Sequence, residues 1–97
     1  MLSQSQKRHL RSLLHSLKPV VMIGQKGLNE NVLSEIEQAL SFHELIKVKI
    51  VAERDERTKM IDAIVEHNDA ELVQQIGHMA GLFRRNPKKP KIVLPSQ

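Results

Sequence analysis

Hydrophobic residues in the first part of the chain recur at the spacing of one face of an α-helix. The positions that carry this period are Leu10, Leu13, Leu14 and Leu17. They predict an amphipathic helix from residue 3 to about residue 17, in which Ser3 and Gln6 match a capping box. Pro19 ends the helix, because proline disfavours helical geometry in the residue before it. A basic stripe repeats on another face of the same helix, at Lys7, Arg11, His15 and Lys18.

Two later segments show the same helical period. The first begins at Asn29, a residue type that caps helix N-termini, and extends to about Phe42. The second extends from Arg54 to about Asn68. Each segment places apolar residues on one face and charged residues on another, so both helices should pack on one side and be solvated on the other.

Short runs between these helices carry the signals of strands. Residues 20–23 are all apolar and stop at a glycine, a pattern typical of a buried strand. In residues 44–51, apolar positions alternate with two lysines, which predicts a strand with one wet face. Residues 72–76 and 79–83 flank Gly77 and His78, so we expect a hairpin whose two-residue turn uses a positive φ at Gly77.

The predicted elements follow the order α-β-α-β-α-β-β, which is typical of an α/β protein. Strands separated by helices favour parallel pairing with right-handed crossovers, whereas a hairpin is antiparallel. We therefore expect a single compact domain over residues 1–97, with a four-stranded mixed sheet and three helices. The packed part should extend from about residue 2 to residue 85, because residues 86–97 form a basic tail rich in proline and lysine.

Charge is segregated along the chain, although the net charge is only +4. All eleven acidic residues lie between Glu30 and Glu71, whereas only basic charges occur before and after that region. These flanking bases are Lys7, Arg8, Arg11, Lys18 and Lys26 on one side, and Arg84, Arg85, Lys88, Lys89 and Lys91 on the other. If the two ends meet in the fold, they form a basic face that attracts polyanions, of which nucleic acid is the commonest. The alternative is that they are ordinary solvated charges.

The composition excludes several classes of function. The chain has no cysteine, which excludes disulfides, thiolate zinc sites and thiol nucleophiles. No two of its five histidines are four residues apart, the spacing that places two ligands on one helix face. We therefore expect no metal site and no cofactor. The longest apolar run, residues 20–23, is far shorter than the roughly 20 residues of a membrane span, and we expect a cytoplasmic protein. Residues 1–27 also match the composition of a mitochondrial presequence, an alternative disfavoured by the strand and glycine turn within them.

The segment Gly24-Gln25-Lys26-Gly27 lies between a predicted strand and the start of a helix. Two glycines let a phosphate approach main-chain N–H groups, while the helix start and Lys26 add positive charge. The chain contains neither the P-loop nor the dinucleotide-binding pattern, so mononucleotide binding is disfavoured. Two interpretations remain: an ordinary tight turn, or the backbone clamp that KH-type RNA-binding domains build on a G-x-x-G loop.

Four segments resemble successive signatures of one family. They are Val21-Met-Ile-Gly-Gln-Lys-Gly-Leu-Asn29, His43-Glu-Leu-Ile-Lys-Val-Lys49, Gln75-Ile-Gly-His78 and Leu82-Phe-Arg84. In this order they resemble the CRM domain, whose standalone bacterial form is the YhbY-type protein. The resemblance implies a fold similar to the C-terminal domain of translation initiation factor three, and RNA binding through the G-x-x-G loop. It also implies association with precursors of the large ribosomal subunit and kinship with plant organelle splicing factors. Two positions depart from the family pattern: Phe83 replaces a tyrosine and Gly81 a larger apolar residue.

The charge pattern and the resemblance lead to one hypothesis. We expect a monomeric RNA-binding protein that associates with ribosomal RNA or large-subunit precursors and assists ribosome assembly. We expect it to bind neither a membrane nor a small-molecule substrate. The expected backbone clamp is Gly24, Gln25, Lys26 and Gly27. The expected flanking phosphate contacts are Arg8, Arg11, Arg84 and Arg85, with Lys7, Lys18, Lys88 and Lys89 as second choices. Both basic ends should converge on the loop side.

The only aromatic residues, Phe42 and Phe83, fall at expected core positions, so we expect phosphate and sugar contacts rather than base stacking on a sheet. Acids such as Glu35, Glu37 and Asp62 are interpreted as solvated helix faces. One alternative function is a protein–protein adaptor on the ribosome that uses this acidic surface. Another is a small enzyme, but we expect none, because no nucleophile and base are grouped by spacing.

Overall fold

The three helices form where the sequence supplies an apolar face, and the first two also have an N-terminal side-chain cap. The structure, a computed structural model, describes residues 2–96, so Met1 and Gln97, the ends of the expected domain, lie outside the described residues. Helix α1 (Gln4–Leu14) begins with the expected capping box between Ser3 and Gln6. Helix α2 (Glu30–His43) is capped by the Asn29 side chain, and α3 (Arg54–His67) ends at the predicted place. Helix α1 ends before residue 17, with His15 as its C-cap.

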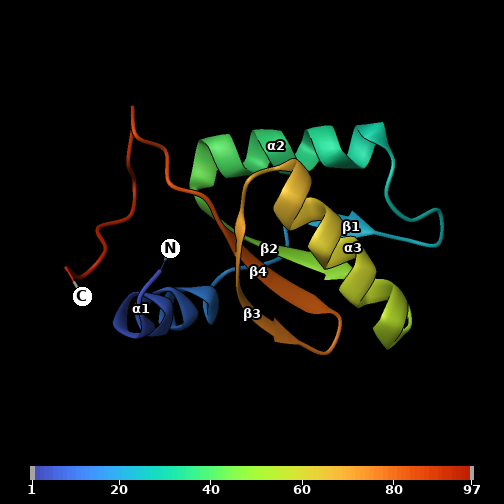
Figure 1. Cartoon of the computed structure of the whole chain (residues 1–97), viewed down its shortest axis with the longest axis horizontal. Helices are drawn as coiled ribbons and strands as arrows, with labels where there is room; N and C mark the ends of the chain where they lie inside the picture. Colours follow the sequence, from blue (N-terminus) through green and yellow to red (C-terminus); the bar gives the residue numbers. More distant parts are fainter. Residues whose placement is uncertain (1, 97) are drawn as a thin grey trace.

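The four strands form one mixed sheet. They are β1 (Val21–Ile23), β2 (Leu45–Ile50), β3 (Glu71–Ile76) and β4 (Met79–Phe83), and their order in the sheet is β1-β2-β4-β3. Strand β1 is parallel to β2, and both other pairings are antiparallel. Gly77 has the expected positive φ, +56°, in the turn between β3 and β4. The predicted element order and the four-stranded mixed sheet with three helices are therefore confirmed (Figure 1).

Helices cover the two faces of the sheet unequally. Helices α2 and α3 pack on one face, over a core of alternate strand residues such as Ile23, Val48 and Leu82. Helix α1 packs on the other face through Leu10 and Leu14, which contribute to a second buried cluster. That cluster lies at one end of the sheet and includes Leu45, Val73 and Phe83. Helix α1 therefore leaves much of this second face of the sheet uncovered.

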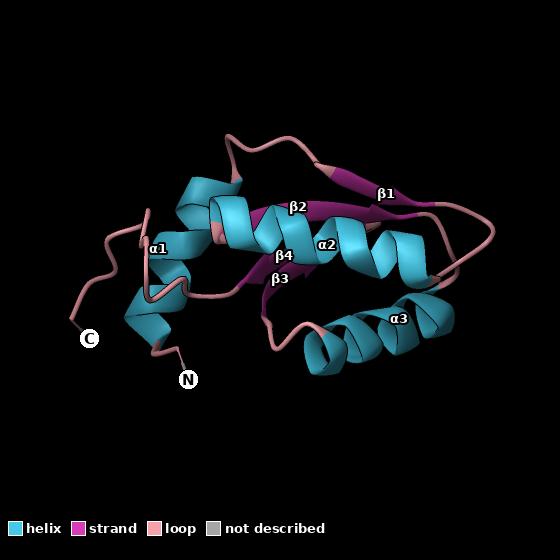
Figure 2. Ribbon diagram, turned by 90° about the horizontal axis from the view of Figure 1, so that it is seen from above, coloured by secondary structure: helices cyan, strands magenta, loops and turns pink. Residues whose placement is uncertain are grey.

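The C-terminal segment belongs to the packed part of the molecule. Ile92 and Leu94 pack against the cluster under α1, and the Gln6 side chain donates a hydrogen bond to the Pro95 carbonyl at 2.9 Å. Figure 2 shows this segment beside α1 at one end of the molecule. The packing extends beyond residue 85, where we expected it to end, because two apolar residues among the prolines and lysines reach back to the core.

Candidate nucleic-acid interface

The Gly24–Gly27 loop follows β1, an edge strand, and precedes the Asn29 cap of α2. The Gly27 N–H donates to the Gly24 carbonyl at 3.0 Å and closes the turn, while Gln25 and Lys26 are exposed at its tip. Gly27 has a φ of +70°, a conformation that L side chains rarely adopt. Gly24 has no positive φ, and no described atom lies within 4 Å of a Cβ built on it. The loop therefore needs one glycine for its backbone geometry, and the other leaves open space beside the main chain.

The basic residues of α1 lie on the helix surface, away from its buried leucines. Arg8 is exposed, whereas Lys7 and Arg11 are half-buried. His15 and Lys18 lie beyond the last helical residue, Leu14, but remain exposed and continue the basic stripe toward β1. All four predicted α1-side contacts, Lys7, Arg8, Arg11 and Lys18, are thus accessible at least in part to a ligand.

The two basic ends of the chain meet each other but not the loop. The molecule measures 39 Å along its longest axis. Helix α1 and the C-terminal segment lie at one end of this axis, and the loop between β1 and α2 projects at the other (Figures 1 and 2). The expected convergence of both basic ends on the loop side is therefore wrong. The reason is that β2 runs between the two regions, from Leu45 under α1 to Ile50, which pairs with Ile23 just before the loop.

Arg84 is engaged within the protein. Its Nη1 and Nη2 atoms donate to the two carboxylate oxygens of Glu37 at 2.7 and 2.8 Å. The same guanidinium also donates to the Asn68 carbonyl at 2.8 Å and to the Ser41 hydroxyl at 2.9 Å. The guanidinium of Arg84 lowers the pKa of Glu37 to about 2, and Glu37 in turn raises the pKa of Arg84. Glu37 is therefore not the simple solvated acid that we expected.

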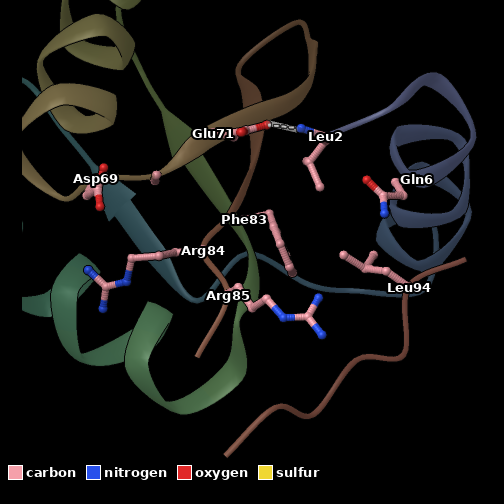
Figure 3. Close-up of a pocket in the computed structure, with 9 residues that line it drawn as sticks. Leu2, Gln6, Asp69, Glu71, Phe83, Arg84, Arg85 and Leu94 are labelled. Atoms are coloured by element: carbon pink, nitrogen blue, oxygen red, sulfur yellow. Dashed lines mark hydrogen bonds between the residues drawn. The ribbon is translucent and has the colours of Figure 1, made fainter. Parts of the chain in front are cut away.

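Arg85 leaves the end of β4 in the direction opposite to Arg84 (Figure 3). It is exposed, as are Lys88 and Lys89 in the segment that follows. Of the predicted contacts at this end of the chain, Arg84 thus has both terminal nitrogens engaged within the fold, whereas Arg85, Lys88 and Lys89 are exposed. Sequence spacing does not distinguish the two arginines, because the partner of Arg84 lies 47 residues away.

Glu44 is a buried carboxylate that we did not single out from the sequence. Its side chain is 1% exposed and accepts backbone N–H bonds from Asn86 at 2.6 Å, Lys91 at 2.7 Å and Ile92 at 2.9 Å. Burial raises the pKa of Glu44, but the backbone N–H donors outweigh burial and leave the pKa below its usual value. Glu44 also has a positive φ of 66°, at the junction of α2 and β2. This residue, here called the carboxylate clasp, holds the basic C-terminal segment on the fold.

Phe42 is 63% exposed, which corrects the expectation that it lies in the core. The buried residues of α2 are Ile36 and Leu40, and a residue two positions after Leu40 falls on the far side of the helix. The Nζ atom of Lys91 lies 4.2 Å from the Phe42 ring centroid, and His43 contacts the ring edge-on. Phe83 is buried, as expected.

A hollow of about 450 Å³ lies between α1, the ends of β3 and β4, and the C-terminal segment (Figure 3). Both signs of charge line it, with Asp69 and Glu71 near one side and Arg85 near another. The Glu71 carboxylate accepts the Leu2 N–H at 3.2 Å. Within residues 2–96 no group of three or more potential ligands could hold a metal ion, and no helix is long and apolar enough to cross a membrane. The mixed charge makes this hollow a poor site for a polyanion.

Comparison with known proteins assigns this architecture to a family. The family model of the CRS1 / YhbY (CRM) domain matches residues 2–84. The chain belongs to this family. The resemblance in sequence is thereby confirmed, and the CRM domain spans every helix and strand of the structure.

Individual relatives cover nearly all of this CRM domain. An RNA-binding protein of Haemophilus influenzae is 50% identical over 95 residues, which are 97% of this chain and 95% of the relative. A probable RNA-binding protein of Pseudomonas aeruginosa is 48% identical over 91 residues, or 93% of this chain and 88% of the relative. The solution structure of a hypothetical protein from Staphylococcus aureus is 38% identical, with a TM-score of 0.83, and covers 98% of this chain and 100% of that one.

The family signatures fall on the features described above. Residues 21–29 form β1 and the glycine loop, and residues 43–49 contain the carboxylate clasp and most of β2. The last two signatures form the hairpin turn and the end of β4 with Arg84. A Cβ at Gly81 would run into the Leu14 side chain of α1. Close packing of α1 on β4 therefore accounts for glycine at this position.

Proposed function

We propose that this CRM domain binds structured RNA, and that its partner is ribosomal RNA in precursors of the large ribosomal subunit, whose assembly it assists. The observation that carries the proposal is the exposed loop at Gly24–Gly27, with Lys26 at its tip and open space beside Gly24. The loop leads into the start of α2, where helix N–H groups favour a phosphate. In this proposal the protein acts as a monomer in the cytoplasm, without cofactor and without catalysing a reaction.

The other cations that we propose as phosphate contacts form two groups. Lys7, Arg8, Arg11 and Lys18 belong to α1 and the turn after it, while Arg85, Lys88 and Lys89 belong to the C-terminal segment. Both groups lie at the end of the molecule remote from the loop (Figure 1). An RNA that contacts all of them has to extend along the 39 Å axis, so a folded ribosomal RNA suits the proposal better than a short ligand.

The experiment is crosslinking of the protein to RNA in cell extract, followed by sequencing of the attached RNA, for the parent and for Lys26→Glu. We expect enrichment of large-subunit ribosomal RNA with the parent and its loss with Lys26→Glu, because a negative charge at the loop tip repels phosphate. Lys59→Glu in α3 makes the same charge change on an exposed lysine elsewhere and should retain binding. Enrichment of messenger RNA instead would overturn the ribosomal assignment. Retention of a ribosomal protein after RNA has been digested would favour an adaptor.

A further inference from the structure

The half of the sheet face beyond α1 is open to solvent. One row of side chains crosses all four strands there, because Met22 pairs with Lys49, Lys49 with Met79, and Met79 with Ile76. Met22 and Ile76 are 65% and 63% exposed, and Lys49 and Met79 are half-buried. These side chains lie on the face opposite α2 and α3, since Val21, Ile23, Val48 and Ile50, their neighbours along β1 and β2, are buried in the core beneath those helices.

A pocket of about 190 Å³ lies where this row meets α1. Its apolar walls include Leu14, Ile76 and Met79, and its polar groups are His15, Lys47 and Gln74. Lys47 pairs with Gly81, and Gly81 with Gln74, so these three form the next row of the same face. At the centre of this row the Leu14 side chain packs over Gly81, and both residues line the pocket.

This surface carries positive charge without acid. We call it the open sheet face and define it as Met22, Lys47, Lys49, Gln74, Ile76 and Met79. Neither these residues nor the described residues that line the pocket include an aspartate or a glutamate. The two lysines are two positions apart on one strand and therefore lie about 7 Å apart on one face. Apolar contact area beside a pair of cations suits an unpaired nucleic-acid strand, whose bases are flat and whose phosphates are anionic.

The open sheet face also lies between the two separated parts of the proposed interface. Strand β2 starts at Leu45, which α1 covers, and runs parallel to β1. Because Ile23 pairs with Ile50, the end of β2 lies beside the start of the glycine loop. Lys47 and Lys49 therefore lie in this order along β2, between the basic stripe of α1 and Gly24.

We propose that the open sheet face is an RNA-binding site that takes an unpaired stretch of the strand, with phosphates on Lys47 and Lys49 and a base in the pocket against Met79. The thioether of methionine contacts aromatic rings favourably, so the site holds a base without an aromatic side chain. The inference rests on the proposed function and extends it, since it connects the loop and α1 into one continuous track.

The first test removes each lysine charge while keeping its apolar stem, with Lys47→Met and Lys49→Met, and uses Lys59→Met in α3 as the matched control. Affinity for deproteinised large-subunit RNA is measured across a series of salt concentrations. Each sheet variant should bind more weakly, and its slope of log affinity against log salt should be smaller by about 0.7 to 1. The control should match the parent in both quantities.

The second test compares two variants that place a negative charge on opposite faces of β3. Gln74→Glu puts a carboxylate of nearly the same shape into the pocket, whereas Gln75→Glu puts it one residue along, on the opposite face of the strand. Gln74→Glu should weaken binding roughly fivefold or more, because it faces RNA with a like charge, and Gln75→Glu should have a much smaller effect. Large-subunit RNA that contains 4-thiouridine should crosslink, through unpaired positions, to peptides from β2 and β4.

The outcomes separate this inference from the proposed function. If the parent binds large-subunit RNA and Lys26→Glu weakens it, but the sheet variants bind like the parent, the open sheet face is not a binding site and the loop proposal stands. Crosslinks confined to peptides outside β2 and β4 would overturn it equally. If the parent does not bind large-subunit RNA at all, the proposed function itself fails and this inference fails with it.

Discussion

Arg84 and Glu37 form a two-point ion pair that joins the end of β4 to the middle of α2, with N–O distances of 2.7 and 2.8 Å. Because the same guanidinium also donates to the Asn68 carbonyl at the end of α3, one side chain connects three elements. The side chain of Arg84 is 21% exposed and that of Glu37 is 50% exposed. Solvent therefore screens the pair in part, and its geometry matters more than its charge.

Replacement of Arg84 by lysine should lower the free energy of unfolding by roughly 1 kcal/mol, since an ammonium cannot make the paired bonds of a guanidinium. Arg85→Lys, one residue later and exposed, is the matched control and should change stability by less than about 0.5 kcal/mol. Urea unfolding of the two variants gives the comparison. If instead Arg84→Lys keeps parental stability and loses RNA affinity, Arg84 is a phosphate contact rather than a structural residue.

Acid should weaken the fold through Glu37. Its pKa in the folded protein, about 2, lies below the ordinary value of 4.5, so folding favours the charged form. The stabilisation is then fully present above about pH 5 and is lost as the pH falls from there toward 2. Unfolding free energies measured between pH 7 and pH 3 should decline less steeply in Glu37→Gln than in the parent. Identical slopes for the two proteins would show that Glu37 contributes nothing to this dependence.

The carboxylate clasp predicts that Glu44 controls the C-terminal segment. Glu44→Gln keeps the size of the side chain but leaves one carbonyl oxygen for three backbone donors, so a buried N–H loses its partner at a cost of about 1–3 kcal/mol. Lys91 and Ile92 donate to one carboxylate oxygen and Asn86 to the other, so hydrogen exchange should accelerate at the amides among these three that face the new NH2 group, while exchange within β2 changes little. Gln38→Glu on the exposed surface of α2 changes charge elsewhere and should leave these amides protected. Unchanged protection in Glu44→Gln would contradict the clasp.

Local sequence signals determined the helices and strands because each depends on neighbours within a few residues. Ser3 with Gln6, Asn29, and the alternation of 44–51 all act over such distances, and the structure has each of them. The errors concern contacts between distant residues. Neither the bond of Arg84 to Glu37 nor the hold of Glu44 on residues 86–92 has a periodic signature. Phe42 departs from the expectation for a different reason: it is aromatic, but its position on α2 is on the side away from the buried Ile36 and Leu40.

Contact between α1 and the sheet depends on Gly81, where a Cβ would run into the Leu14 side chain. Gly81→Ala should therefore lower stability by about 1 kcal/mol or more through overpacking, since Leu14 is 2% exposed and has little room to move. Leu14→Ala alone should cost more, about 2–5 kcal/mol, by leaving a cavity. In the double variant the new methyl group occupies part of that cavity, so the combined loss should be smaller than the sum. Strictly additive losses in urea unfolding would mean that the two residues do not interact.

Alanine substitutions at the two glycines of the loop distinguish two effects: the loss of close approach by RNA and the strain of the backbone. Gly24→Ala adds a methyl group where no described atom lies within 4 Å and no positive φ is required, so the free energy of unfolding should stay within about 0.5 kcal/mol of the parent. Gly27→Ala forces a side chain into a φ of +70° and should cost about 1–2 kcal/mol. If a phosphate packs against the main chain at Gly24, Gly24→Ala weakens RNA binding without loss of stability, whereas Gly27→Ala weakens both. Thermal unfolding and affinity for large-subunit RNA, measured on the same preparations, decide between them. Parental affinity in Gly24→Ala would mean that RNA meets this loop only through Lys26, because the main chain would then not be approached at all.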